Sequence, residues 1–349
     1  MNPMECDRPG TLSLPEYSSG PGGPVQHSPT TAAVATLVVP SPVTPVSAAP
    51  ERLPLPEAVA PIRIRWSYAT SIAVVHLLAL TAFMPWFFTW SGAAVCFLGL
   101  YVFGTLGVNL CFHRLLTHRS FKCSKRTEHF LALLGVCCLQ EGPARWVSIH
   151  RRHHQHSDEQ PDPHSPLVTF LWGHMGWLIV ENRDTDTFHL YQRYARDLVR
   201  QPFYLNMERS LNWLWVYTAH ALLFAVAGFG AGWLLTGTVS GAAQFAASIV
   251  VWGVLVRTVL VWHITWSVNS LSHLFGYQSH DTGENSRNNW LVALLSNGEG
   301  WHNNHHADQR SAAHGHKWYE IDVTYLTILA MEKLGLASNV MRYDRSTKH

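Results

Sequence analysis

Two long stretches of the chain contain no charged residue. The first runs from Trp66 to Phe112, and the second runs from Ser210 to Val256. Each stretch is more than twice as long as the roughly 20 residues that one membrane-spanning helix needs. Each therefore predicts two spans joined by a short turn. We place the turns at Pro85 to Gly92 and at Leu235 to Gly241, where proline or glycine interrupts the apolar pattern.

The predicted spans cover residues 67–88, 92–111, 211–235 and 242–268. Neither turn carries a charge, whereas Arg63 and Arg65 precede the first span and several cations follow the second. The positive-inside rule then places both termini and both long polar segments on the cytoplasmic side. One charge, Arg257, interrupts the fourth predicted span. Because an arginine at the centre of a bilayer is costly, we expect it at the end of that span.

The ends of the chain differ in composition from the part that carries the spans. Twelve of the 19 prolines lie in residues 1–60, mixed with Ser, Thr, Ala and Gly. Such a segment cannot bury enough apolar surface to form a core, so residues 1–60 are predicted to be a disordered tail. The main domain is predicted over residues 61–340, and residues 341–349 form a short C-terminal tail.

Composition excludes some classes of function and directs attention to the histidines. Charged residues make up 14% of the chain and the formal net charge is +2, so no strong field favours a nucleic-acid partner. The six cysteines show no C-x-x-C spacing, which argues against a cysteine metal site and a disulfide framework. The 22 histidines are far more than a core or a surface requires. Their positions therefore indicate the chemistry.

Eight of these histidines form three clusters in the polar segments. The clusters are His113 with His118, then His150, His153 and His154, and finally His302, His305 and His306. In a helix, each H-x-x-H-H triplet places its three imidazoles on one face, as a metal site requires. His113 and His118 are five residues apart, about 140° around an α-helix. They can face one site only if the helix ends or bends between them.

The number of ligands favours two metal ions, since one zinc ion needs only three or four. A further pair, Asn269 and His273, lies four residues apart just after the last span. Imidazole binds iron, zinc, copper and nickel alike, so the ligand type does not choose the metal. The position of the site indicates iron. A site beside apolar spans meets lipid tails, and the activation of their C–H bonds requires O2 and redox-active iron.

These clusters resemble those of the membrane-bound fatty acid desaturases, particularly the acyl-CoA (stearoyl-CoA type, Δ9) branch. The likeness covers about residues 62–337 and includes the H-x4-H box and both H-x-x-H-H boxes. The linking residues agree as well: Ser157 with Asp158, Asp162 with Pro163 and His164, Asn269 with Ser270, and Trp301. The family fold implies an all-α membrane protein, with four transmembrane helices in two hairpins and a cytosolic helical cap holding a dimetal site.

The resemblance implies a role for particular residues. Two Fe²⁺ ions would be bound by nine histidines: His113, His118, His150, His153, His154, His273, His302, His305 and His306. Asn269 would reach one ion through water. The channel for the acyl chain would be lined by Gln140, Trp146, Thr265 and Trp266. Phe97 and Tyr101 would close the acyl tunnel, and these two rings favour chains of about 16 carbons or fewer over 18, so that replacing Tyr101 with alanine lengthens the preferred substrate.

The implied reaction is O2-dependent formation of a cis double bond in a fatty acyl chain. Animal acyl-CoA desaturases carry an Arg-Asp pair before the second box, whereas this chain has Ser148 and Ile149. The carrier is therefore open between an acyl thioester and an acyl lipid, with anion contacts available from Arg145, Arg151, Arg152 or Arg193. No His-Pro-Gly-Gly haem motif is present, so electrons are expected from a separate donor of the ferredoxin or cytochrome b5 type.

Carboxylates are expected to support the ligands by accepting the second N–H of each ring. The candidates are Asp158, Asp162, Glu299 and Asp322. Eight further histidines have no expected ligand role: His156, His164, His174, His189, His263, His280, His314 and His316. Among these, His164 and His314 are the best candidates for supporting groups.

Three other functions fit parts of the pattern. An alkyl-chain or carotenoid hydroxylase uses similar chemistry, and product analysis would separate it from a desaturase. A histidine-rich metal transporter or sensor should carry ligands within its spans. Only His76, His220 and His263 are available there, without an acidic partner. A silent lipid-binding relative is disfavoured because every box keeps its histidines.

Overall fold

The structure is a computed structural model that describes residues 51–344. Residues 1–50, most of the predicted disordered tail, lie outside the described residues, as do residues 345–349. Residues 51–60 are ordered: helix η1 (Glu57–Val59) carries the buried Val59, and the Leu53 backbone N–H donates to the carbonyl of Leu167 at 3.2 Å. Within the described residues, 51–60 therefore pack against the main domain, although composition assigned them to the tail.

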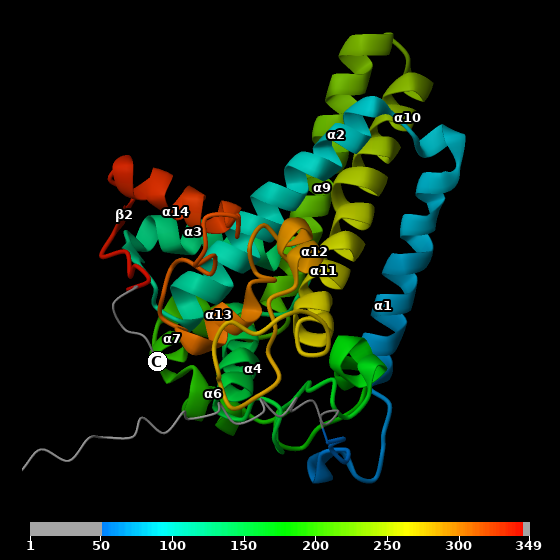
Figure 1. Cartoon of the computed structure of the whole chain (residues 1–349). Helices are drawn as coiled ribbons and strands as arrows, with labels where there is room; N and C mark the ends of the chain where they lie inside the picture. The colour runs from blue at the N-terminus through cyan, green and yellow to red at the C-terminus, as the bar shows by residue number, and fades with distance from the viewer. Residues whose placement is uncertain (1–50, 345–349) are drawn as a thin grey trace, which may run out of the picture. The chain divides into compact units, whose positions relative to one another are not determined.

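The described residues are mostly helical (Figure 1). The first half contains α1 (Trp66–Ala79), η2 (Leu80–Phe83), η3 (Pro85–Phe87), α2 (Trp90–Gly99), η4 (Leu100–Thr117), α3 (Lys125–Val136) and α4 (Pro143–Gln155). The middle contains η5 (Trp172–Gly176), α5 (Trp177–Ile179), α6 (Phe188–Tyr194), α7 (Arg196–Val199) and α8 (Pro202–Glu208). The last part contains α9 (Asn212–Thr236), α10 (Val239–Val250), η6 (Val251–Val256), α11 (Arg257–Leu271), α12 (Trp290–Leu295), α13 (His302–Ala307) and α14 (Val323–Lys333).

Four continuous helical segments among residues 51–344 are long and apolar enough to cross a membrane, as the hydropathy pattern predicted. They cover Trp66–Phe83, Trp90–Thr117, Asn212–Thr236 and Val239–Leu271. Helices α9 and α10 pack along each other, and α10 also contacts α2 (Figure 1). The second segment runs six residues beyond its predicted end at residue 111, so it carries the first histidine cluster into the polar region.

Arg257 lies inside the fourth helical segment, and its place at the end of the membrane-crossing part of that segment stays a prediction. The helical segment continues from Arg257 to Leu271, and the side chain is fully buried. Its guanidinium donates to the carbonyls of Gly253 at 3.0 Å and Cys137 at 2.8 Å, and it lies over the ring of Phe103. These backbone oxygens and the aromatic ring solvate the charge, so no interfacial water is needed.

Short polar turns set the helix ends. The hydroxyl of Thr89 accepts a hydrogen bond from the backbone N–H of Gly92 at 2.9 Å and caps α2. Thr238 caps α10 in the same way. Between α9 and α10, Gly237 adopts a φ of +65°, a left-handed conformation that glycine adopts without strain, and α9 ends there.

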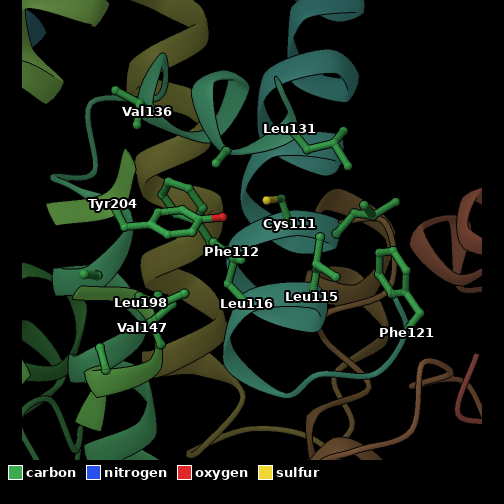
Figure 2. Packing of buried hydrophobic residues seen from close by; sticks show 14 of the residues in the cluster. Cys111, Phe112, Leu115, Leu116, Phe121, Leu131, Val136, Val147, Leu198 and Tyr204 are labelled. Atoms are coloured by element: carbon green, nitrogen blue, oxygen red, sulfur yellow. The ribbon is translucent and has the colours of Figure 1, made fainter. Parts of the chain in front are cut away.

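A buried hydrophobic cluster holds η4 against the polar half of the molecule (Figure 2). Phe112 and Leu116 of η4 pack with Val147 of α4 and with residues of α3, α7 and α8. The cluster includes one polar contact, in which the hydroxyl of the buried Tyr204 donates to Glu128 at 2.8 Å. Because this core fixes η4 and α4 together, it also fixes two of the histidine clusters relative to each other.

A two-stranded antiparallel sheet ties the C-terminal part to the loop after η4. Strand β1 (Lys122–Cys123) pairs with β2 (Ala337–Ser338). The backbone N–H of Met341 then donates to the carbonyl of Ser120 at 2.8 Å. The chain after α14 is therefore anchored beside the end of η4.

Candidate metal centre

The structure brings nine histidines together in two groups, namely the eight histidines of the three boxes and His273. The first group contains His113, His118, His150, His154 and His305, and the second contains His153, His273, His302 and His306. Within each group, the possible ligand atoms all lie within 4.8 Å of one another. Segments far apart in the sequence thus form two adjacent sites, each of which could hold a metal ion.

Each H-x-x-H-H triplet contributes to both groups. On α4, His150 and His154 belong to the first group and His153 belongs to the second. On α13 the pair four residues apart, His302 with His306, belongs to the second group, and His305 belongs to the first. The helix spacing therefore explains why two such triplets suit a pair of ions better than a single ion.

The first cluster reaches one site through a change of helix type. Segment η4 is a π-helix, and the backbone N–H of His118 donates to the carbonyl of His113, five residues earlier, at 3.2 Å. This wider turn places residues five apart on one face, and the two ring centroids are 4.8 Å apart. As the spacing required, the helix ends between the two histidines, at Thr117, and its last turn is wider than an α-helical turn.

The spacing of the ring nitrogens suits metal binding. In the first group, Nε2 of His305 lies 3.1 Å from Nε2 of both His113 and His154. In the second group, Nε2 of His302 lies 3.0 Å from that of His273 and 3.1 Å from that of His306. Two nitrogens bound at about 2.1 Å to one ion, roughly at right angles, are about 3 Å apart.

Two further observations agree with metal binding. The Nε2 atoms of His118 and His153 are buried and have no hydrogen-bond partner, which is costly unless another group satisfies them. Burial and neighbouring imidazoles also lower the pKa of six rings, namely His118, His150, His154, His302, His305 and His306. Neutral imidazole is the form that binds a metal, so the residues present fit two metal ions.

Carboxylates hold the other nitrogen of several rings. Nδ1 of His153 donates to Asp162 at 2.9 Å, and Nδ1 of His273 donates to Asp158 at 2.9 Å. Nδ1 of His113 donates to Glu299. These contacts fix the tautomer and leave Nε2 facing the group, as is usual for metal-bound histidine.

His273 differs in its protonation. Burial lowers its pKa, but the carboxylate of Asp158 more than offsets this and raises it to about 9. The same contact holds the pKa of Asp158 below its usual range although burial raises it. A metal ion at Nε2 of His273 would therefore displace a proton.

Three of the four carboxylates predicted to support the ligands contact them, and the fourth does not. Asp322 instead accepts from the guanidinium of Arg114 at 2.9 Å and from the backbone N–H of His314 at 2.7 Å. Its place beside a ligand is taken by Glu284, which lies 3.5 Å from Nδ1 of His306 and 3.6 Å from Nδ1 of His273. Glu284 lies in an irregular loop, and no motif in the sequence pointed to it.

A fully buried ion-pair network joins the first histidine box to the third. Arg114 donates to Glu299 at 2.6 Å through Nη2, and it also contacts Asp322. Burial raises the pKa of Glu299, but Arg114 and His113 more than offset it, so the pKa lies below its usual value. The charge of Arg114 thus keeps Glu299 ionised next to His113.

Two of the remaining histidines lie against the ligand groups, as expected for supporting residues. The ring of His314 is 4.3 Å from that of His305, and its Nδ1 lies 3.5 Å from Glu299. The ring of His164 is 4.5 Å from that of His153. Both side chains are buried.

The histidines in the spans form no third site of this kind. His76 lies 3.1 Å from His263, which contacts His174 at 3.0 Å, so these rings form a chain of hydrogen bonds rather than a cluster. His220 lies beside Arg257. Within residues 51–344 none of these rings belongs to a group of three converging ligand atoms, which disfavours a transport path for metal.

A largely apolar cavity of about 370 Å³ lies against the first histidine group. Its lining includes His113, His150 and Asn269. It also includes the four residues expected to contact the acyl chain, Gln140, Trp146, Thr265 and Trp266. Three of these four are linked to one another: the indole N–H of Trp146 donates to Gln140, whose amide donates to the hydroxyl of Thr265, each at 3.0 Å.

Phe97 and Tyr101 do not line this cavity. Phe97 is 72% exposed on α2, and the hydroxyl of Tyr101 contacts that of Thr327 at 2.8 Å. The wall on the η4 side is formed by Val108, which is buried against Cys138 and Val261. The structure therefore places the two rings expected at the tunnel end away from the cavity that it contains.

A model of the fatty acid desaturase family matches residues 84–323. Three relatives illustrate the range of similar proteins. The chain is 42% identical over 283 residues to the sn-1 stearoyl-lipid 9-desaturase of Anabaena variabilis, which covers 81% of this chain and 96% of that protein. It is 40% identical over 294 residues to the sn-2 palmitoyl-lipid 9-desaturase of Nostoc sp., covering 84% of this chain and 94% of that protein. It is 41% identical over 269 residues to an acyl-CoA C20 Delta5-desaturase of Anemone leveillei, covering 77% and 79%.

Proposed function

The chain belongs to the fatty acid desaturase family, and from that premise we propose that it introduces a cis double bond at the Δ9 position of an acyl chain carried by a membrane lipid. The reaction would take place at two Fe²⁺ ions bound by the nine clustered histidines, with Asn269 reaching one ion through water. It consumes O2, two electrons and two protons, removes two hydrogens from adjacent methylenes, and forms two waters.

One observation carries this proposal: two groups of histidines converge beside an apolar cavity that is lined by aromatic rings. A bound pair of ferrous ions supplies the O2 chemistry that an unactivated C–H bond requires. The protein supplies the positions. Trp146, Gln140 and Thr265 form one hydrogen-bonded wall, so the path past His113 and His150 is fixed before the chain enters.

We propose an acyl lipid as the substrate instead of the acyl-CoA expected from the resemblance. The two relatives first described are named lipid desaturases, although an acyl-CoA enzyme is also similar. Ser148 is buried and donates its hydroxyl to the carbonyl of Ala144 at 2.7 Å, and Ile149 lines the cavity. Neither side chain can contact the CoA headgroup in the way expected of the Arg-Asp pair of animal enzymes.

The candidate anion contacts are largely occupied as well. Arg151 pairs with Asp197 at 2.8 Å, and Arg152 pairs with Asp184 at 2.7 Å. Arg145 pairs with Glu141 at 2.7 Å. Each of these three guanidiniums would have to leave a carboxylate before it could bind a phosphate, which supports a carrier without several phosphates. The fourth candidate, Arg193, is exposed and lies over the ring of Tyr194 without an ion pair among residues 51–344.

The topology belongs to the same proposal. Two hairpins would span the bilayer, and residues 113–209 and 269–349 would form a cytoplasmic cap that faces a separate donor of the ferredoxin or cytochrome b5 type. The cations around the ends of the first two spans support this orientation, since cytoplasmic loops are enriched in Lys and Arg.

Expression in cells that lack their own desaturase tests the function. Mass spectrometry should find new monounsaturated acyl chains with the double bond at carbon 9, and they should be esterified to lipids. His153→Ala should abolish them while the folded protein is retained. Hydroxylated chains would instead indicate the hydroxylase alternative, and an unchanged lipid profile with iron and a donor supplied would contradict the proposal.

A further inference from the structure

The cavity beside the metal groups reaches the molecular surface between two membrane-spanning segments. Its lining includes Ser67 and Ser71 on the first turns of α1, and Leu211 and Leu214 at the start of α9. All four residues are exposed, and Leu211 is 56% accessible. An opening between the first turns of two spans lies at the level where a bilayer meets water. We call this opening, defined by these four residues, the portal.

A second cavity of about 710 Å³ adjoins the portal. It shares Tyr68, Glu141, Leu211 and Trp213 with the first cavity, so the two are direct neighbours. We call this second cavity the vestibule. A molecule whose acyl chain occupies the first cavity must place its polar end in or next to the vestibule.

The vestibule contains both signs of charge, with acidic groups in excess. Its lining includes three arginines and four carboxylic acids: Arg65, Arg145, Arg183, Glu141, Glu181, Asp186 and Glu208. A site that binds several phosphates needs cations with free donors. The vestibule has no such excess of cations.

The arginines are also engaged. Arg65 and Arg145 both pair with Asp186, and Arg145 pairs with Glu141 too. Arg183 donates to two backbone carbonyls, of Ala58 at 3.3 Å and of Glu57 at 3.2 Å. The guanidinium donors are thus largely occupied within the protein, whereas the carboxylates keep lone pairs that can accept from a ligand.

We propose that the vestibule holds the headgroup of a bilayer lipid whose acyl chain enters through the portal, and that it selects headgroups which donate hydrogen bonds and carry no net negative charge. Sugar hydroxyls and an ammonium group share this chemistry. The inference rests on the proposed function and makes it more specific, because it names the class of lipid and its route of entry.

The state of Glu208 agrees with such a ligand. This carboxyl group is largely buried between α4 and α6, where it accepts from the backbone N–H of Ala144 at 2.8 Å and from the hydroxyl of Tyr191 at 3.3 Å. Burial raises its pKa to about 7. A site that already disfavours one buried carboxylate is a poor site for a headgroup with a net negative charge.

Lipid selection is tested with the iron-loaded protein in vesicles supplied with O2 and a reduced donor of the ferredoxin type. Two quantities are measured: the lipid that stays bound to the protein after purification, and the desaturated product. Four substrates carry the same stearoyl chains: a monoglycosyl diacylglycerol, phosphatidylethanolamine, phosphatidylglycerol and, added from solution, stearoyl-CoA. The glycosyl lipid and phosphatidylethanolamine should be retained and desaturated at least tenfold better than phosphatidylglycerol and stearoyl-CoA. The comparison of the glycosyl lipid with phosphatidylethanolamine then identifies whether sugar hydroxyls or an ammonium group is preferred. Equal or better use of phosphatidylglycerol or stearoyl-CoA would overturn the inference. Retention without product from any substrate would instead contradict the proposed desaturase function.

Two variants test the vestibule by charge. Glu181 lines it, is exposed, and forms no ion pair within the described residues, so Glu181→Lys adds a cation without breaking a contact. The variant should shift the preference toward phosphatidylglycerol by about threefold or more. The matched control Glu51→Lys makes the same charge change at an exposed position outside the lining and should change nothing. Equal effects of both variants would indicate a general surface charge effect and would contradict a specific headgroup site.

The portal is tested by size. Ser71→Trp should fill the opening and reduce both retained lipid and product at least tenfold, while the iron content stays the same. Ala73→Trp places the same ring on an exposed position of α1 that does not line the cavity, and it should leave both quantities unchanged. Full activity of Ser71→Trp would show that the chain enters elsewhere.

Discussion

Asp162 accepts a hydrogen bond from Nδ1 of His153 at 2.9 Å, while the buried Nε2 of the same ring has no partner. The carboxylate therefore determines which nitrogen of His153 faces the second histidine group. Its other contacts are with the backbone N–H groups of Asp158 and His164, each at 3.0 Å. These contacts hold the carboxylate in place, so ring orientation is set by the loop that follows α4.

Asp162→Asn should weaken metal retention by the second group. The amide keeps an acceptor for one backbone N–H but lacks the charge that orients and polarises His153, and loss of such a partner typically reduces metal affinity about 10- to 100-fold. Iron analysis after dialysis should find about one ion per chain instead of two. The control Asp184→Asn removes an exposed carboxylate paired with Arg152 and should retain both ions. Equal loss from both variants would indicate a general effect on folding.

Arg114→Met should destabilise the fold as well as the site. Arg114 is fully buried, and its removal leaves Glu299 and Asp322 without their cation. Loss of one partner of a buried ion pair costs about 3–5 kcal/mol. Denaturation of the detergent-solubilised protein should show the loss even without bound metal. If the variant has the same denaturation midpoint as the wild type, the prediction is wrong, and water or local relaxation must stabilise the two carboxylates in place of Arg114.

Glu208 should make stability depend on pH. Burial raises its pKa to about 7 in the folded protein, and its neighbours there are Glu141, Arg145, Tyr191 and the backbone N–H of Ala144. The folded state therefore holds a proton that the unfolded state has lost, so stability falls as the pH rises from about 4.5 to 7. Below this range both states are protonated, and above it both are ionised.

Glu208→Gln removes this titration and keeps a similar shape. As the pH rises from 5 to 7.5, the free energy of unfolding of the variant should therefore increase relative to that of the wild type by about 1–3 kcal/mol. Melting curves of both proteins across this pH range measure the change. Glu159→Gln, at an exposed carboxyl in the loop after α4, is the control and should give a constant difference. A constant difference for Glu208→Gln as well would mean that Glu208 is already ionised at pH 5.

Much of the fold was predictable because it depends on properties that are local in sequence. The absence of charge over two long stretches indicated four spans, and the i, i+3, i+4 spacing indicated how α4 and α13 present their histidines. The π-helical geometry of η4 was not predictable in this way. It depends on which hydrogen bonds form between residues five apart, and no residue type specifies that choice.

Contacts between distant segments could not be predicted. Glu284 supports two ligands from a loop without regular structure, and Arg257 is solvated inside the protein by carbonyls such as that of Cys137. Hydropathy assigns a cost to a charge in a span but cannot identify a carbonyl more than 100 residues away that reduces it. The role of Phe97 at the tunnel end stays a prediction, since its exposure on α2 shows only that it does not line the cavity beside the first histidine group.

Chain-length preference should depend on Val108 and not on Phe97 or Tyr101. Val108 is 2% exposed, lines the cavity, and lies one π-helical turn before His113. Val108→Phe adds bulk to a wall that is already packed against Cys138 and Val261. Because a single methylene in an apolar pocket changes specificity about tenfold or more, the variant should use 18-carbon chains at least tenfold less than 14-carbon chains, relative to the wild type.

Product analysis by mass spectrometry separates this prediction from the one based on the resemblance. Phe97→Ala removes a ring that is mostly exposed, and Tyr101→Ala removes a hydroxyl that contacts Thr327 instead of the cavity. Both variants should therefore give the wild-type distribution of chain lengths. Longer products from Tyr101→Ala would instead show that the acyl chain continues along α2 beyond Val108, with Tyr101 at its end, and that this wall opens when substrate is bound.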